Sequence, residues 1–319
     1  MARAKTTPLK EDLADLPALV VRMRAGERRA ISRAVTELER FSAAAPRLLQ
    51  AMAPHLGHAL VLGFTGPPGA GKSTLVNAFT QHARARSKTI GIIAVDPSSP
   101  VSGGAILGDR IRMTATLDDD GVFMRSLASR GHLGGLSPAA VRIIDALDAA
   151  GKDLILIETV GTGQSEIDVA EVADVRILVT APGLGDDIQA MKAGLIEMAD
   201  IMVVNKADRE GADRAVQHLK AALSLRAHDR QKVPVLKTTA TTGGGIDGLT
   251  AAIDAVGADR LGEGAQARRR RRARYLIARA AADLLARRVR DGGGRDLDGL
   301  ADAVLSGTVS AEEAARRLL

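Results

Sequence analysis

The chain has 319 residues, of which 46% are apolar and 2% aromatic, and its formal net charge at pH 7 is +6. It contains no cysteine, which excludes disulfides, thiolate metal sites and a cysteine nucleophile. The apolar content suffices for one large α/β domain, but so few aromatics leave little to stack on bases, and we expect no nucleic-acid partner. No apolar run approaches the roughly 20 residues of a membrane span, and the polar start is unlike a signal peptide. We therefore expect no membrane partner and a cytoplasmic location, with an organellar presequence as the weaker alternative.

Residues 1–56 are expected to form a helical N-terminal extension. Apolar residues recur there at three- and four-residue spacing after Asp12, which is typical of amphipathic helices. Gly26 and Pro46 are expected to break the pattern. The expected inward-facing positions are Leu19, Met23, Ile31, Val35, Leu38, Leu48, Leu49 and Met52.

Residues 57–257 are expected to form the main domain, because short apolar runs alternate there with helical patterns. The expected strands are Ala59–Thr65, Thr89–Val95, Val122–Ser126, Leu154–Glu158, Val175–Thr180, Ile201–Val204 and Val233–Leu236. Short apolar strands separated by helices predict an α/β fold with a mostly parallel sheet covered on both faces. Ligands of such sheets bind at the carboxyl ends of the strands.

A phosphate-binding motif follows the first of these strands. The segment reads Gly-Pro-Pro-Gly-Ala-Gly-Lys-Ser, which matches G-x-x-x-x-G-K-[ST], and a helical pattern starts directly after it. The glycines let backbone N–H groups face phosphate oxygens, Lys72 can reach the β and γ phosphates, and the Ser73 hydroxyl can bind Mg²⁺. The nucleotide-binding residues expected here are Gly66, Pro67, Pro68, Gly69, Ala70, Gly71, Lys72, Ser73 and Thr74.

A second motif, N-K-x-D, indicates that the base is guanine. The Asp208 carboxylate can accept hydrogen bonds from the N1–H and the exocyclic amine of guanine, whereas adenine offers neither donor at these positions. A buried acid left unpaired costs on the order of 1 to 3 kcal/mol. Asn205 and Lys206 are expected to tie this base loop to the phosphate loop and to cover the base. The turn expected to contact the guanine carbonyl through a backbone N–H, that of Ala240, consists of Thr239, Ala240 and Thr241. The predicted cofactors are GTP or GDP with Mg²⁺.

Three acids between the two motifs are candidates for catalysis and for binding Mg²⁺ together with Ser73. Asp96 and Glu158 end expected strands, and Asp109 lies in Gly-Asp-Arg-Ile-Arg-Met. Mg²⁺ takes one or two carboxylates besides phosphates and waters, so one acid can bind the metal, another can hold a metal-bound water and a third can orient the attacking water. The assignment among them stays open. With Lys72 they are the predicted catalytic residues; a strand-end turn for Asp96 and a surface ion pair for Asp109 are the alternatives.

The segment after Glu158 is expected to sense the γ phosphate. Gly161 can offer its N–H to that phosphate. In Ras-like GTPases a glutamine that orients the attacking water directly follows this glycine, but here Thr162 holds that position and Gln164 comes two residues later. We therefore expect slow intrinsic hydrolysis that depends on a partner.

Residues 258–319 are expected to form a helical dimerisation region. Apolar residues recur at helical spacing from Tyr275 to Val289, which leaves the basic run Arg268–Arg272 to a solvated or partner-facing side. The Gly-rich stretch Asp291–Gly294 interrupts the pattern, and a capping box at Ser310–Glu313 starts a last helix. A broad apolar face outside the main domain favours a homodimer, with packing against the same chain as the alternative.

Together these motifs resemble the MeaB/ArgK family of P-loop GTPases over nearly the whole chain. The matching stretches are Gly63–Thr74, Val95–Pro100, Gly108–Met113, Ser129–Gly135, Glu158–Glu166 and Asn205–Asp208. The resemblance implies a homodimeric G-protein chaperone that gates cofactor loading and protects its partner. That partner is an adenosylcobalamin-dependent acyl-CoA mutase, typically methylmalonyl-CoA mutase. It also implies a third switch at Gly185–Gly194. Residues expected to couple nucleotide state to the partner are Gln164, Gln189 and Lys192, although an ordinary solvated helix start also fits the last two.

Three other functions compete with this interpretation. A nickel-inserting GTPase needs thiolates or clustered imidazoles, but the chain has no cysteine and six scattered histidines. A kinase, of the kind once proposed for ArgK relatives in basic amino-acid transport, would usually use ATP, which Asp208 disfavours. A ribosome- or RNA-binding GTPase is disfavoured by the scarcity of aromatic residues.

Overall fold

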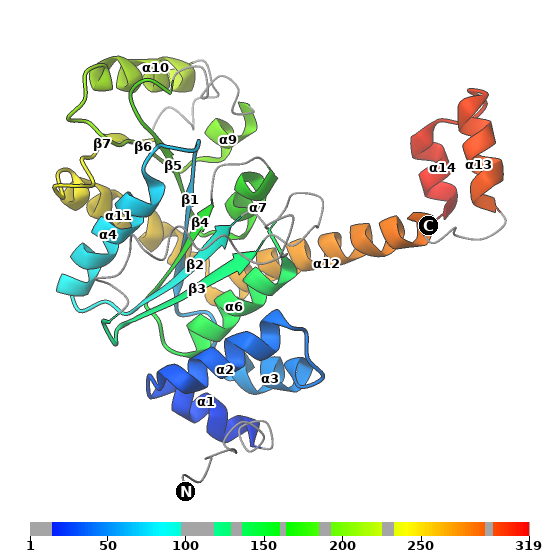
Figure 1. The fold of residues 1–319 in the computed structure, drawn as a ribbon, viewed down its shortest axis with the longest axis horizontal. Coiled ribbons are helices and arrows are strands. Elements are labelled where there is room, and N and C mark those ends of the chain that lie inside the picture. Colours follow the sequence, from blue (N-terminus) through cyan, green and yellow to red (C-terminus); the bar gives the residue numbers. More distant parts are fainter. Residues whose placement is uncertain are drawn as a thin grey trace, which may run out of the picture. The chain divides into compact units, whose positions relative to one another are not determined.

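A computed structural model describes residues 15–96, 118–128, 136–159, 164–184, 193–224, 233–290 and 296–318 (Figure 1). The strands are β1 Leu60–Thr65, β2 Ile90–Asp96, β3 Val122–Ala128, β4 Leu154–Thr159, β5 Val175–Thr180, β6 Ile201–Val204 and β7 Val235–Lys237. The helices before β3 are α1 Leu16–Arg24, α2 Arg28–Glu39, α3 Ala45–Met52, the short 3₁₀ helix Ala53–His55 and α4 Lys72–Ala85. The later helices are α6 Pro138–Ala149, α7 Gln164–Val172, α9 Ala193–Met198, α10 Ala212–Ser224, α11 Ile246–Gly262, α12 Ala265–Arg290, α13 Asp296–Leu305 and α14 Ala311–Leu318.

The strands form one seven-stranded parallel sheet in the order β3-β2-β4-β1-β5-β6-β7. All seven expected strands are present, with shifts of at most two residues at their ends, so the α/β prediction is confirmed. β1 lies in the middle, between β4 and β5. Because the chain order reverses around β1, the carboxyl end of this strand is where a sheet of this type binds ligands.

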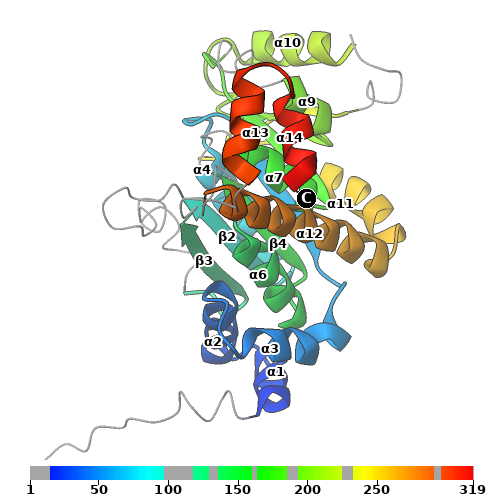
Figure 2. The same cartoon turned by 90° about the vertical axis from the view of Figure 1, so that its right-hand side faces the viewer.

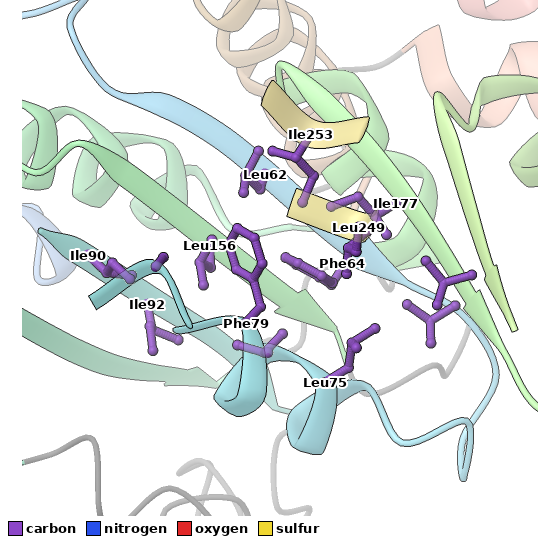
Figure 3. Close-up of a cluster of buried hydrophobic side chains, with 14 of the residues drawn as sticks. Leu62, Phe64, Leu75, Phe79, Ile90, Ile92, Leu156, Ile177, Leu249 and Ile253 are labelled. Carbon is purple, nitrogen blue, oxygen red and sulfur yellow. The ribbon is translucent and has the colours of Figure 1, made fainter. Parts of the chain in front are cut away.

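The main core lies between the sheet and helices α4 and α11. Leu62 and Phe64 of β1 meet Phe79 of α4 and Ile253 of α11 in one buried cluster (Figure 3). The rings of Phe64 and Phe79 have centroids 6.1 Å apart. Figure 1 shows α6 and α7 on the other side of the sheet. Helices therefore cover both faces, as the continuous apolar character of the strands requires.

The N-terminal helices α1, α2 and α3 pack together and against α6 (Figure 2). Of the expected inward-facing positions, all are buried except Leu49, which is half-buried. Gly26 separates α1 from α2 in a left-handed conformation, with φ at 81°. Pro46 does not break a helix, because it lies in the first turn of α3, where its missing N–H has no helical partner to lose.

The chain divides into two compact units, residues 1–271 and 272–319. The second unit holds the rest of α12 with α13 and α14, and its own small apolar cluster includes Leu300 and Ala314. The Ser310 hydroxyl accepts a hydrogen bond of 3.1 Å from the Glu313 N–H, which confirms the expected cap of the last helix. The Gly-rich stretch at 291–294 lies outside the described residues. No helix in the described ranges has the length and apolar character needed to cross a membrane.

The basic run at the start of α12 corrects the sequence analysis. Arg268 was expected on a solvated side, but its side chain is only 2% exposed and pairs with Asp174 at 3.0 Å. Ile277 and Leu284, on the apolar face expected to contact a second copy or the same chain, are 69% and 70% exposed. Helical spacing indicates which residues of α12 share a face. It does not indicate that Arg268 is buried against Asp174, an acid far away in the sequence.

Candidate nucleotide-binding site

The phosphate loop joins β1 to α4 and is pressed closely against its neighbours. A Cβ on Gly66 would lie 1.9 Å from the carbonyl oxygen of Val179 in β5, and a Cβ on Gly71 would lie 2.5 Å from Asn205 Nδ2. Gly71 also has a left-handed backbone, with φ at 85°. Side chains at these positions would push the loop outward, so the glycines preserve a backbone cradle of the kind that surrounds phosphate groups.

Lys72 lies inside this cradle. Its side chain is buried, and Nζ donates to the carbonyl oxygens of Gly66 at 2.8 Å and Pro67 at 3.0 Å. Ala70 packs into the main core and so fixes the loop to the body of the domain. No side chain caps the N-terminus of α4. Its first N–H groups and the ammonium of Lys72 therefore suit a phosphate anion.

The structure brings two of the four expected metal-binding residues together. The Ser73 hydroxyl donates a short hydrogen bond to Glu158 Oε1. Glu158 is buried near the end of β4, next to Phe64 of β1 in the register of the sheet. A hydroxyl beside a carboxylate is a hard oxygen set that fits Mg²⁺. Asp96 ends β2 on the other side of β4, but its side chain and all of Asp109 lie outside what the structure describes.

The base loop is tied to the phosphate loop by two side chains. Asn205 is buried, and its Nδ2 donates to the carbonyl oxygens of Ala70 at 3.0 Å and Gly71 at 3.3 Å. Lys206 has a left-handed backbone, with φ at 56°, and its Nζ donates to the Gly69 carbonyl at 2.7 Å. The sequence motifs predict both connections, and the structure contains them.

Asp208 follows this anchored pair and is exposed. Within the described part of the chain it makes no hydrogen bond or ion pair, so its carboxylate is available to a ligand. The neighbouring turn is closed by a hydrogen bond of 2.8 Å from the Thr239 N–H to the Gly244 carbonyl. The Ala240 N–H donates to Asn205 Oδ1 at 3.2 Å. The roles expected of Thr239, Ala240 and Thr241 toward the base stay predictions.

Two contacts of the site were not predicted from the sequence. Several residues that were predicted lie outside the described part of the chain. Thr238 donates to Asn205 Oδ1 at 3.1 Å, and Val179 supports Gly66; neither belongs to a motif, so no sequence signal marks them. Gln164 begins α7, but its side chain is not described. The predicted sensing and coupling residues outside the described ranges are Gly161, Gln189 and Lys192.

Replacing Glu158 by glutamine is expected to raise the Mg²⁺ concentration needed for half-maximal GTP hydrolysis by about tenfold, the lower end for losing a residue that orients a metal site. The charge is lost but the shape beside Ser73 is kept. Titration of Mg²⁺ in a GTPase assay measures this, with Asp119→Asn, an acid paired to Arg84 at 2.8 Å outside the site, as the control. An unchanged Mg²⁺ requirement with lower turnover would instead assign Glu158 to the attacking water.

The comparisons with known proteins agree with this geometry. The family model for the methylmalonyl Co-A mutase-associated GTPase MeaB matches residues 28–293. A Pyrococcus horikoshii protein described as a GTPase is 50% identical over 235 residues, 72% of this chain and 74% of its own. The mouse protein named methylmalonic aciduria type A homolog, mitochondrial, is 39% identical over 190 residues, 58% of this chain and 46% of its own. A crystal structure of an LAO/AO transport system kinase superposes with a TM-score of 0.74 at 28% identity, covering 100% of this chain and 98% of that one.

Proposed function

Because the chain belongs to the MeaB family of P-loop GTPases, we propose that it is a GTP-dependent chaperone of an adenosylcobalamin-dependent acyl-CoA mutase, with methylmalonyl-CoA mutase the first candidate. In this role it gates the loading of the mutase's cofactor and protects the mutase, in the cytoplasm. The observation that carries the proposal is the family match across residues 28–293, which spans both nucleotide loops. The family is named for its association with that mutase.

Each part of the site has a task in this proposal. The N-terminus of α4 and Lys72 bind the β and γ phosphates, and Asp208 selects guanine by accepting from its two edge donors. Ser73 and Glu158 hold Mg²⁺, which neutralises charge that develops on the phosphates when it is bound. The residue after Gly161, a water-orienting glutamine in Ras-like GTPases, is Thr162 in this chain. We therefore expect slow hydrolysis that the mutase accelerates.

The exposed side chains of the C-terminal region support a protein–protein role. Ile277, Leu284 and Leu305 are 69%, 70% and 85% exposed, and leaving large apolar side chains in water costs free energy. We assign this surface to a second copy of the chain, so that the working chaperone is a homodimer. The mutase is then expected to contact the nucleotide unit.

Capture of the purified mutase on the immobilised full-length chain tests the proposal. We expect retention to differ at least tenfold between a nonhydrolysable GTP analogue and GDP, and we expect Asp208→Asn to lose this dependence at the same nucleotide concentration. Equal retention with both nucleotides, or none, would contradict the chaperone role. If the immobilised chain instead captures ribosomal or hydrogenase proteins from a lysate of its own cells, another GTPase class is correct.

A nucleotide-dependent kinase is the second candidate, because the superposable crystal structure is that of an LAO/AO transport system kinase. A kinase of that kind would usually take ATP, whereas the available carboxylate of Asp208 favours guanine. Competition between GTP and ATP for the site separates the two. Preferential binding of ATP would favour the kinase.

A further inference from the structure

Helix α7 lies directly on the backbone of β1. It begins at Gln164, close after the predicted γ-phosphate sensor Gly161, and it contacts β1, β4 and β5. A Cβ on Gly63 of β1 would lie 2.7 Å from Val169 Cγ1 and 2.9 Å from the Ala173 Cβ. At Gly63, therefore, no side chain separates the helix from the strand.

The C-terminal end of α7 is attached to α12 through Asp174, in the turn between α7 and β5. Asp174 is 1% exposed. Its Oδ2 accepts from the Val61 N–H and from Arg268 Nη1, both at 3.0 Å, and its Oδ1 accepts from Arg271 Nη2 at 2.8 Å. Arg268 also donates to the carbonyl oxygens of Ala59 at 3.0 Å and Gly57 at 2.7 Å. Both oxygens of one buried carboxylate therefore hold the first two turns of α12.

Further ion pairs extend this attachment to the end of α11 and the start of β6. Glu263 links Arg271 at 3.3 Å to Arg260 at 2.8 Å, and Asp200 links Arg260 at 3.0 Å to Arg176 at 2.7 Å. Burial alone would raise the pKa of Asp200, but the hydrogen bonds and charge of Arg176, with the charge of Arg260, hold that pKa below its usual value. The corner between α11 and α12 is thus ionised and firmly paired.

The α7 side of the sheet is less completely hydrogen-bonded near the nucleotide site. Thr65 and Thr159 end β1 and β4 on the α7 side of the sheet, because residues two apart in a strand share a face and neighbouring positions of paired strands point the same way. Their hydroxyls are buried without a hydrogen-bonding partner among the described residues. Buried hydroxyls are normally paired. This end of the sheet face therefore carries two hydroxyls without a described partner, whereas Asp174 at the other end of α7 is fully paired.

We propose that Asp174, Arg268 and Arg271 form a coupling clamp that passes the nucleotide-dependent position of α7 to α12. The three are positioning residues and touch no nucleotide. The clamp rests on the proposed function. It explains how the presence or absence of the γ phosphate would affect the part of α12 beyond Arg271. α12 continues as one helix to Arg290, within the second compact unit.

Hydrogen exchange of the full-length chain, with GDP or with a nonhydrolysable GTP analogue, tests the clamp. In the wild type we expect the amides of Ala265–Arg271 to exchange at rates that differ severalfold between the two nucleotides. In Asp174→Asn the difference is expected to disappear while the dissociation constants for both nucleotides change less than twofold. A merely structural role would lower stability without removing the dependence on nucleotide.

Asp148→Asn is the matched control. Asp148 is also buried at this end of the sheet and accepts from the N–H groups of His58 at 3.0 Å and Ala59 at 2.9 Å, but no described arginine of α12 pairs with it. It should lose stability and keep the nucleotide-dependent difference. Arg271→Gln, at a half-exposed position, removes one arm of the clamp if Asp174→Asn does not fold, and it should reduce the difference.

The results separate the clamp from the chaperone role. A nucleotide-dependent difference in α12 that survives in Asp174→Asn, or that is undiminished in Arg271→Gln where that variant replaces it, overturns the clamp. Absence of the difference from the wild type overturns it as well. A clamp that passes this test while the mutase is not retained would leave the coupling standing and remove the proposed partner.

Discussion

Replacement of Asp208 by asparagine is expected to weaken GTP binding by about 100-fold, the scale of a lost charge-assisted hydrogen-bond pair of roughly 3 kcal/mol. The carboxylate accepts from both edge donors of guanine, whereas asparagine offers one acceptor and places a donor against the other. The same exchange should improve binding of xanthosine triphosphate, because the xanthine C2 carbonyl can accept from the new amide. Loss for one base and gain for another identifies direct recognition.

Isothermal titration calorimetry with GTP, ATP and xanthosine triphosphate measures this switch. Asp213→Asn removes an exposed acid nearby that pairs with Lys237 at 2.9 Å, and it should leave all three affinities unchanged. Because Asp208 is exposed and unpaired in the described structure, its exchange should not destabilise the fold. A wild type that binds GTP and ATP equally, or a variant as selective as its parent, would refute guanine recognition by Asp208.

Local pattern was enough to predict the sheet and the two loops. The strand leading to the phosphate loop is a continuous apolar run. Gly66 and Gly71 belong to the phosphate-loop motif, in which glycines let the backbone approach its neighbours closely, as it does here. Asn205 could be assigned to the phosphate loop because its motif implies a partner far away in the sequence. The contact to Ala70, 135 residues apart, is the one that the motif predicts.

Contacts between residues that no motif links could not be predicted. Arg268 lies in a basic run whose spacing indicates a solvated face, yet it pairs with Asp174, 94 residues away. A guanidinium enters the interior only where a buried carboxylate and free carbonyl oxygens meet it, and helical periodicity contains no information about either. Asp174 itself looks like an ordinary polar residue before a strand. The sequence therefore could not predict the pairing of Asp174 with Arg268 and Arg271, on which the proposed clamp rests.

Exchange of Lys72 for alanine should reduce GTP hydrolysis by about 100- to 1,000-fold, the usual effect of removing one donor to developing negative charge. Nζ now donates to two loop carbonyls, at 2.8 and 3.0 Å, so it is already held inside the cradle where the β and γ phosphates are expected. Arginine should not replace it, since its fork is larger and less compact than an ammonium. We expect Lys72→Arg to be nearly as defective as Lys72→Ala.

Single-turnover hydrolysis at saturating GTP separates this effect from weaker binding, and thermal unfolding shows whether the loop survives. Lys88→Ala is the control, because Lys88 is half-exposed and lies 3.8 Å from Asp153 at the opposite end of the sheet. In Lys72→Ala the carbonyls of Gly66 and Pro67, two buried residues, lose a partner, which should cost about 1–3 kcal/mol of stability. We expect a lower but still cooperative thermal transition, which distinguishes lost turnover from lost folding. Turnover close to that of the wild type would mean that another cation neutralises the phosphates, and the site would have to be reassigned.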